Sequence, residues 1–411
     1  MNILMVIADY YPGPEGGAER QCRKLVHALS KIGHTCCVLT SCHRFGCARI
    51  TKDAGSKVFR VGRLWPVFSL LEVACRKLLL GCCIRNERAL HAILFWALLP
   101  IRWLARLAFL IELRSVIHRL QPRPDVIHVH ESGWLAGVGI WLGKILRVPV
   151  VCKVRNTPAL DVIGYDVPFR KRWEKLRRAA RFIALHDQLR VELLDAGIDS
   201  SRISVIPNGV ELPHFSVGGE NPCEVLYVGN FSQGSAHKGF DILIRAWGSV
   251  SAANPDARLI MVGGGNYDRW VALAQACGCA DSVCFLGPVR DIASFYQRAC
   301  LFVLPSRREG MSNALLEAQS YGLPAVVSDI PANRAVVCDG VNGVLFQTED
   351  CDMLAKQILR LLSDIDLREK MGAAARIRME QAFSMETVCA RLISFYKKTG
   401  HLTHEDSTFL L

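Results

Sequence analysis

Two glutamates eight positions apart, Glu309 and Glu317, are the side chains of this sequence best placed to bind a polar ligand. A strand-like run, Leu301–Leu304, precedes the pair, and a helix-forming run, Ala314–Gln319, contains the second glutamate. We therefore expect Glu309 in the loop between strand and helix, and Glu317 on the first turns of the helix. Because carboxylates accept hydrogen bonds from hydroxyl groups, the pair predicts contacts with a sugar or a ribose.

The residues between the two glutamates predict a phosphate site. Ser312 or Asn313 can cap the helix, which leaves backbone N–H groups aimed outward. Gly310 and Met311 complete the turn. A helix N-terminus of this kind favours a phosphate. The short segment could therefore bind a sugar, a diphosphate and a ribose together, as a nucleotide-sugar requires.

The elements that position these residues follow the pattern of parallel sheets wrapped by helices. Apolar runs of about four to eight residues alternate with helical stretches, which predicts an α/β fold of two doubly wound, Rossmann-like domains with a cleft at the carboxyl ends of their strands. The expected strands of the first half are Ile3–Ala8, Thr35–Thr40, Val58–Val61, Val126–His130, Val148–Val154, Phe182–Leu185 and Ile203–Ile206. Those of the second half are Glu224–Val228, Ala257–Val262, Ser282–Leu286, Leu301–Leu304, Ala325–Ser328 and Gly343–Phe346.

The alternation restarts after a proline- and glycine-containing stretch, Pro213–Pro222, which is a plausible hinge. We therefore predict an N-terminal domain over 1–210 and a C-terminal domain over 211–384, both Rossmann-like. A last helix over 385–398 is expected to cross back to the first domain. The tail over 399–411 has the composition of a disordered segment.

One segment, 64–120, interrupts the alternation because it is largely helical, apolar and basic. Its most apolar stretch, Ala89–Ile101, is shorter than the roughly 20 residues that span a bilayer. Trp96 and Trp103 suit an interfacial depth, and the arginines suit acidic headgroups. We expect this segment to lie on an acidic membrane surface; an ordinary helix pair packed on the first domain is the alternative.

Composition limits the possible partners and the compartment. The net charge of +12 over 411 residues fits an anionic partner, and we expect a phosphorylated substrate and acidic lipid and no nucleic acid. The start, Met1–Tyr10, lacks the basic region of a signal peptide and is typical of a buried first strand. We therefore expect a cytoplasmic protein, peripheral on the inner face of the membrane, whose 17 cysteines are free thiols.

Five separated segments with chemistry-bearing residues occur in one order along the chain: Pro14–Glu19, Asp125–His130, Val205–Val210, His237–Gly239 and Glu309–Glu317. This order resembles the large retaining glycosyltransferase family 4, the glycosyl transferases group 1, which has the two-domain GT-B fold. The resemblance covers nearly the whole chain, and it implies that the domain over 1–210 is the acceptor side and the domain over 211–384 binds the nucleotide-sugar. It implies transfer of a hexose from a nucleotide-diphosphate sugar to an acceptor hydroxyl, with retention of the anomeric configuration.

The resemblance also implies roles for single residues. Gly16 and Gly17 would close over the donor diphosphate and sugar, and glycines let backbone N–H groups approach a phosphate. His130 would lie beside the transferred sugar; His128 shares its face, but His130 is nearer the carboxyl end of the strand, where open sheets bind ligands. Lys238 would pair with the leaving diphosphate.

On the donor side, the resemblance assigns sugar hydroxyls to Glu309 and ribose hydroxyls to Glu317, with backbone N–H groups of Gly310, Met311, Ser312 and Asn313 facing the sugar or phosphate. Asn208 would line the cleft, and Gly263 would border the base or the phosphate. We thus expect His130, Glu309 and Lys238 to be the catalytic residues.

The chain departs from the family pattern at Asn230, where members commonly have an arginine. Phosphate charge would then be met by Lys238, by helix N-termini, or by another base such as His237 or Arg307. We expect no cofactor and no metal.

The expected acceptor is a lipid-linked or surface glycan, as in cell-envelope polysaccharide or lipopolysaccharide biosynthesis. Alternatives are a sugar-nucleotide epimerase or phosphorylase of similar architecture, and a non-catalytic protein that binds a sugar nucleotide.

Overall fold

The structure, a computed structural model, describes residues 1–11, 16–42, 48–62, 104, 107–131, 133–155, 179–214, 223–289 and 291–400. Contacts divide the chain into two compact units. Unit 1 comprises Met1–Val154, Asp161–Ile183 and Ser394–Leu411, and unit 2 comprises Arg155–Leu160 and Ala184–Ile393. The domain boundary at residue 210 remains a prediction.

The first sheet is mostly parallel, with β1 near its centre. Its strand order is β3-β4-β2-β1-β5-β6-β7-β8, and β1 pairs in parallel with both β2 and β5. The sequence order reverses between β1 and β5, so the loops that leave these two strands meet at a topological switch point. The strands are β1 (Asn2–Val6), β2 (Thr35–Ser41), β3 (Ile50–Asp53), β4 (Ser56–Val61), β5 (Val126–Val129), β6 (Val150–Val154), β7 (Arg181–Ala184) and β8 (Ile203–Val205).

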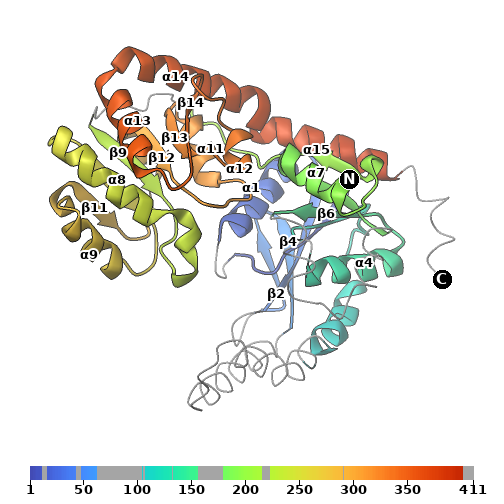
Figure 1. The fold of residues 1–411 in the computed structure, drawn as a ribbon. Coiled ribbons are helices and arrows are strands. Elements are labelled where there is room, and N and C mark those ends of the chain that lie inside the picture. Colours follow the sequence, from blue (N-terminus) through green and yellow to red (C-terminus); the bar gives the residue numbers. More distant parts are fainter. Residues whose placement is uncertain are drawn as a thin grey trace. The chain divides into compact units, whose positions relative to one another are not determined.

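The second sheet belongs to unit 2, and its strand order is β11-β10-β9-β12-β13-β14. Counted along the chain from β9, this is the 3-2-1-4-5-6 order of a doubly wound fold. The switch point therefore lies between β9 and β12, which Figure 1 shows next to each other. The strands are β9 (Glu224–Val228), β10 (Arg258–Val262), β11 (Val283–Leu286), β12 (Leu301–Leu304), β13 (Ala325–Ser328) and β14 (Gly343–Phe346).

Helices cover these sheets through apolar stripes. In unit 2, α13 packs against α8 and contacts β12, β13 and β14, while α11 packs against α14 (Figure 1). Trp247 of α8 is fully buried, and burial of such a side chain stabilises the unit by about 2 kcal/mol or more. The helices include α1 (Gly17–Lys31), α4 (Trp134–Leu146), α7 (Asp187–Asp195), α8 (Phe240–Ala253), α9 (Asp268–Ala276), α11 (Asn313–Ser320), α13 (Cys351–Ser363), α14 (Ile365–Arg378) and α15 (Met385–Gly400).

The α/β fold with two parallel, Rossmann-like sheets is confirmed, and the expected strands agree with the observed ones to within one or two residues. One strand was missed: β3 forms an antiparallel edge hairpin with β4. Its turn residues Ala54 and Gly55 both have positive φ, at 45° and 84°, as a two-residue hairpin turn requires. The sequence of β3, Ile50–Asp53, is too polar for the apolar-run criterion that found the other strands.

Most of the basic segment 64–120 lies outside the described residues, as do the expected hinge from residue 215 onward and the tail beyond residue 400. Within the segment, 107–117 is a helix whose buried face includes Phe109, Leu113 and Val116. Among the described residues, no helix combines the length and the apolar content that crossing a bilayer needs. Every cysteine that the structure describes is a free thiol, as expected.

Candidate active site

The switch point of the second sheet brings together two loops that sequence analysis singled out. The loop after β9 runs through the 3-10 helix Gln233–Lys238 to the start of α8, and the loop after β12 runs from Pro305 to the start of α11. Because β9 and β12 are neighbours, both loops leave the same edge of the sheet. The fold therefore places Lys238 and Glu309 together.

Lys238 and Glu309 form an ion pair, with Nζ 2.6 Å from Oε1. The Ser306 hydroxyl donates a second hydrogen bond, of 2.8 Å, to the same oxygen. The lysine side chain is 22% exposed and the glutamate 9% exposed. The pair is therefore shielded on the protein side and open enough for a ligand to reach the ammonium group. Since an ammonium has three N–H donors, Lys238 can bind Glu309 and a phosphate oxygen at once.

A glycine holds the lysine loop against its neighbour. Gly239 has φ of +70°, a left-handed conformation that side chains with a Cβ rarely adopt. A Cβ at this position would lie 2.1 Å from the carbonyl oxygen of Pro305. The backbone of the lysine loop can thus approach the glutamate loop closely only because residue 239 is a glycine.

The α11 helix begins as predicted. The Ser312 hydroxyl accepts a hydrogen bond from the backbone N–H of Leu315, which makes Ser312 the N-cap. Glu317 lies on the second turn, where the Tyr296 hydroxyl donates a 3.1 Å hydrogen bond to its Oε2. Tyr296 is 1% exposed, so the phenol restrains the carboxylate from the protein side. Sequence analysis did not identify this tyrosine.

Two further residues of unit 2 contact the turn before α11. Asn208 is buried; its backbone N–H points at the Met311 sulfur at 3.3 Å, and its amide donates a 3.0 Å hydrogen bond to Asn313 Oδ1. His186, the N-cap of α7, bonds the backbone of Gly310, and burial lowers the pKa of its imidazole. Asn208 was predicted and His186 was missed, although His186 lies two residues beyond the end of β7, on the side of the sheet where ligands bind.

Arg307, one of the bases proposed to replace the missing arginine, is already bound by two carboxylates. Its guanidinium donates hydrogen bonds of 2.9 and 2.8 Å to Asp241, and it also pairs with Glu349. These two carboxylates hold the pKa of Arg307 far above its usual value. Its backbone N–H bonds the carbonyl of His237 at 2.7 Å, so Arg307 joins the lysine loop to the glutamate loop. The side-chain Oδ1 of Asn230 accepts a 3.0 Å hydrogen bond from the backbone N–H of Ser232, so this side chain stabilises its own turn.

Gly263 follows β10, and its conformation has a packing explanation. Its φ is +154°, and a Cβ would lie 1.7 Å from the carbonyl oxygen of Gly229. The glycine therefore lets the loop after β10 pack against the start of the lysine loop. Its contact with a base or phosphate remains a prediction.

In unit 1, the switch point between β1 and β5 lies beside Gly16, Gly17 and His130. Gly17 is the first residue of α1 and Gly16 precedes it, so both lie at a helix N-terminus. His130 directly follows β5 and is 3% exposed. Its ring stacks on that of His128, with centroids 4.4 Å apart and planes at 4°. The two histidines share one face, as strand periodicity predicted.

Lys153 is a buried cation of unit 1 that sequence analysis missed. It lies on β6, is 5% exposed, and follows Cys152, the register partner of Val129 on β5. Its charge acts with burial to lower the pKa of His128, to about 3. Because the residues around Lys153 in Val150–Val154 are apolar, sequence analysis predicted a strand here and assigned the lysine no role.

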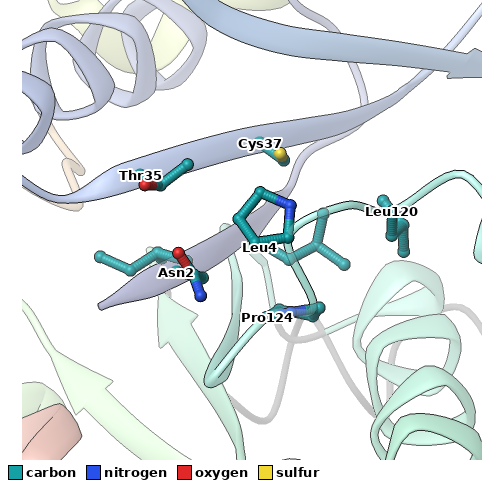
Figure 2. A pocket seen from close by; sticks show the side chains of 8 residues that line it. Asn2, Leu4, Thr35, Cys37, Leu120 and Pro124 are labelled. Atoms are coloured by element: carbon teal, nitrogen blue, oxygen red, sulfur yellow. The ribbon is translucent and has the colours of Figure 1, made fainter.

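A shallow depression on unit 1 does not coincide with either switch point. It is lined by residues from the amino-terminal ends of β1 and β2 and by Leu120, Pro122 and Pro124 (Figure 2). Ligands of open α/β sheets bind at the carboxyl ends of strands, which is the opposite edge. The described residues contain no group of three His, Cys, Asp or Glu side chains arranged to hold a metal ion.

Comparisons with known proteins agree with this architecture. Residues 15–213 match the family model described as Glycosyltransferase Family 4, and residues 215–378 match the one described as Glycosyl transferases group 1. A D-inositol 3-phosphate glycosyltransferase of Thermobifida fusca is 28% identical over 322 residues, which cover 70% of this chain and 73% of that protein.

Two solved structures are similar in fold. Sucrose-phosphate synthase from Thermosynechococcus elongatus has a TM-score of 0.70 at 19% identity, covering 97% of this chain and 98% of that one. The Anabaena protein HepE in complex with UDP and glucose has a TM-score of 0.70 at 18% identity, covering 96% and 99%. At these identities the likeness establishes the fold alone.

Proposed function

This chain belongs to the family 4 glycosyltransferases of group 1 and is an enzyme of the transferase class, and we propose that it moves a hexose from a nucleotide-diphosphate sugar. The proposed acceptor is a hydroxyl of a lipid-linked or surface glycan, and the transfer retains the anomeric configuration. The observation that carries the donor half is the Lys238–Glu309 pair at the switch point beside the capped end of α11. A UDP-sugar is the first donor to test, because UDP is the nucleotide held by the similar HepE structure.

In the proposed reaction, the acceptor oxygen attacks the anomeric carbon from the same face of the sugar as the one from which the leaving group departs. The bond from that carbon to the diphosphate oxygen breaks, and the acceptor proton passes to the leaving phosphate. The protein's contribution is positioning and charge stabilisation. Lys238 and the backbone N–H groups at the α11 N-terminus stabilise the diphosphate as its charge grows.

The remaining site residues position the donor. Both hydrogen bonds from Lys238 and Ser306 end on Glu309 Oε1, and we assign Oε2 to a sugar hydroxyl. Glu317, whose carboxylate is restrained by Tyr296, accepts hydrogen bonds from the ribose hydroxyls. His130 lies beside the transferred sugar. We propose that no metal takes part, so EDTA should leave the rate unchanged and added MgCl₂ should not raise it.

Product analysis tests this function. A panel of UDP- and GDP-sugars is first ranked by thermal stabilisation of the protein, since a ligand that binds the folded state raises the midpoint. The best donor is then incubated with lipid-linked glycan acceptors, with Glu309→Gln as the inactive control. Nucleotide release with a sugar-extended acceptor supports transfer. Formation of free epimerised sugar nucleotide, or of a sugar phosphate, would contradict it.

We propose further that the enzyme works at the inner face of the cell membrane, as a peripheral protein. The described end of the basic segment supports this: Leu104, Leu107 and Ile111 are 56%, 45% and 63% exposed. They lie at helical spacing, and Arg114 is exposed one turn further on. Exposed apolar side chains beside a cation suit the headgroup region of an acidic membrane.

Vesicle sedimentation tests the membrane contact. Leu107→Ser/Ile111→Ser should lose binding to vesicles that contain acidic phospholipid. A double variant of two comparably exposed isoleucines in unit 2, Ile365→Ser/Ile377→Ser, should bind as the wild type does. Equal binding by both double variants, or equal binding of the wild type to acidic and neutral vesicles, would argue against this surface.

A further inference from the structure

A row of three buried aromatic rings in unit 1 ends at His130. The first ring is Tyr396 of α15, the second is His128 of β5 and the third is His130. All three are almost completely buried, with exposed fractions of 1%, 0% and 3%. Although 268 positions separate Tyr396 from His128, both belong to the same compact unit.

Each ring fixes the next by a different contact. The Tyr396 hydroxyl forms a hydrogen bond with His128 Nδ1, and the two rings meet edge to face at 76° with centroids 5.8 Å apart. His128 then stacks on His130 with its plane only 4° from parallel. Because the two buried rings are stacked with centroids 4.4 Å apart, a tilt of the His128 ring would force the His130 ring to move as well.

The middle ring depends on the tyrosine for its orientation. Burial, together with the charge of Lys153, lowers the pKa of His128 to about 3, so the imidazole is neutral at neutral pH. A neutral imidazole has one N–H and one acceptor nitrogen. Within the described part of the chain, His128 Nε2 has no hydrogen-bond partner. The hydrogen bond to Tyr396 thus selects the tautomer of His128 and restrains rotation of its imidazole ring.

We propose that Tyr396 is a positioning residue for the transfer reaction, acting through His128 on His130. The inference rests on the proposed function, in which His130 lies beside the transferred sugar. Groups beside a reacting centre must be held to within about 0.5 Å and 10–20° of the productive geometry. The helix α15 therefore contributes a side chain that shapes the site, in addition to packing.

The test compares two buried hydroxyls of α15. Tyr396→Phe removes the hydroxyl and keeps the ring, so the packing remains. The matched control is Thr399→Val, which removes a buried hydroxyl that bonds the Tyr396 carbonyl oxygen at 2.6 Å, one turn along the same helix. Both proteins are labelled with ¹⁵N-histidine, and ring ¹⁵N shifts report the tautomers of His128 and His130 without any ligand.

If Tyr396 positions His130 through His128, Tyr396→Phe should change the tautomer signals of His128 and shift or broaden those of His130. Thr399→Val should leave the signals of both histidines unchanged. His130 signals that do not move in Tyr396→Phe, or that move equally in Thr399→Val, would overturn the proposal. This readout does not depend on catalysis.

Kinetics with UDP-glucose as the probe then separate the two proposals. We expect Tyr396→Phe to lower kcat for UDP release by about tenfold to a hundredfold with KM unchanged, because misplacement of a positioned group acts on the reacting geometry. A fall in thermal stability with kcat unchanged would indicate a purely structural tyrosine and refute positioning. A wild-type protein that releases no UDP with any acceptor would count against the proposed function, while the ring signals still decide the positioning.

Discussion

Removing the charge of Lys238 should reveal how the site binds a diphosphate. In Lys238→Met, the side chain keeps much of its length and loses its three N–H donors. A hydrogen bond to a charged group contributes about 1.5–3 kcal/mol. Its loss should therefore weaken UDP binding by about 10- to 150-fold.

A second effect should also weaken UDP binding by Lys238→Met. Glu309, whose side chain is only 9% exposed, would lose its cation and face the diphosphate unpaired. Two unit charges about 4 Å apart at an effective dielectric constant of 20 interact with about 4 kcal/mol, and solvent reduces this at a partly open site. We therefore expect Lys238→Met to approach the upper end of that range. Lys238→Met/Glu309→Gln should recover part of the lost affinity for UDP, because it removes the repulsion.

Isothermal titration with UDP and with UDP-glucose separates the two side chains. Glu309→Gln should bind UDP at least as well as the wild type and UDP-glucose less well, because its carboxylate is assigned to the sugar. The control is Lys356→Met, which removes the same charge from an exposed position on α13. If Lys238→Met binds UDP with wild-type affinity, or if Lys356→Met weakens binding equally, then Lys238 does not contact the diphosphate.

Three other substitutions have definite expected outcomes. Gly239→Ala should destabilise unit 2 by about 2 kcal/mol or more, measured by urea unfolding, whereas Gly340→Ala, at a similar φ of +72° with open space, should cost about 1 kcal/mol. Tyr296→Phe should weaken UDP binding by about tenfold and 2′-deoxy-UDP binding less, since it frees the Glu317 carboxylate that we assign to the ribose; equal losses would exclude a ribose role. The folded-state pKa of His128, about 3, is below its unfolded value of about 6.5, so its contribution to stability is complete above pH 6.5 and is lost as the pH falls toward 3. The wild type should therefore lose about 2 kcal/mol relative to His128→Asn between pH 7 and pH 5 in unfolding experiments, and parallel pH profiles would contradict this.

Rules based on local sequence predicted those elements whose residue pattern matches their burial in the fold. Strands buried on both faces of a parallel sheet are short apolar runs, so β9 and β12 were found at their observed positions. A cap at Ser312 or Asn313 followed from residue type and from the helix that comes next, and in the structure Ser312 is the N-cap. The neighbourhood of Lys238 and Glu309 was expected only through the family resemblance, because 71 positions separate the two residues.

Local rules failed where a partner is distant in the sequence or a charged residue lies in an apolar run. No spacing rule connects Tyr396 to His128, and none connects His186 to Gly310. Lys153 was predicted only as part of a buried strand, yet its charge acts on His128 of the neighbouring strand. The ion pairs of Arg307 with Asp241 and Glu349 likewise could not be predicted, because both partners are distant from Arg307 in the sequence.

The two ion pairs of Arg307 argue against this residue as the cation that binds the diphosphate. Its guanidinium faces two carboxylates, Asp241 and Glu349, so the cluster carries a net negative charge and would have to break two ion pairs to serve a ligand. Lys238 faces one carboxylate, and its remaining N–H donors need not leave that carboxylate to reach a phosphate. With asparagine at position 230, we therefore propose that Lys238 and backbone N–H groups at helix N-termini balance the charge of the leaving group. The N–H groups at a helix N-terminus are fixed dipoles, which cost little reorganisation when charge develops on a leaving phosphate.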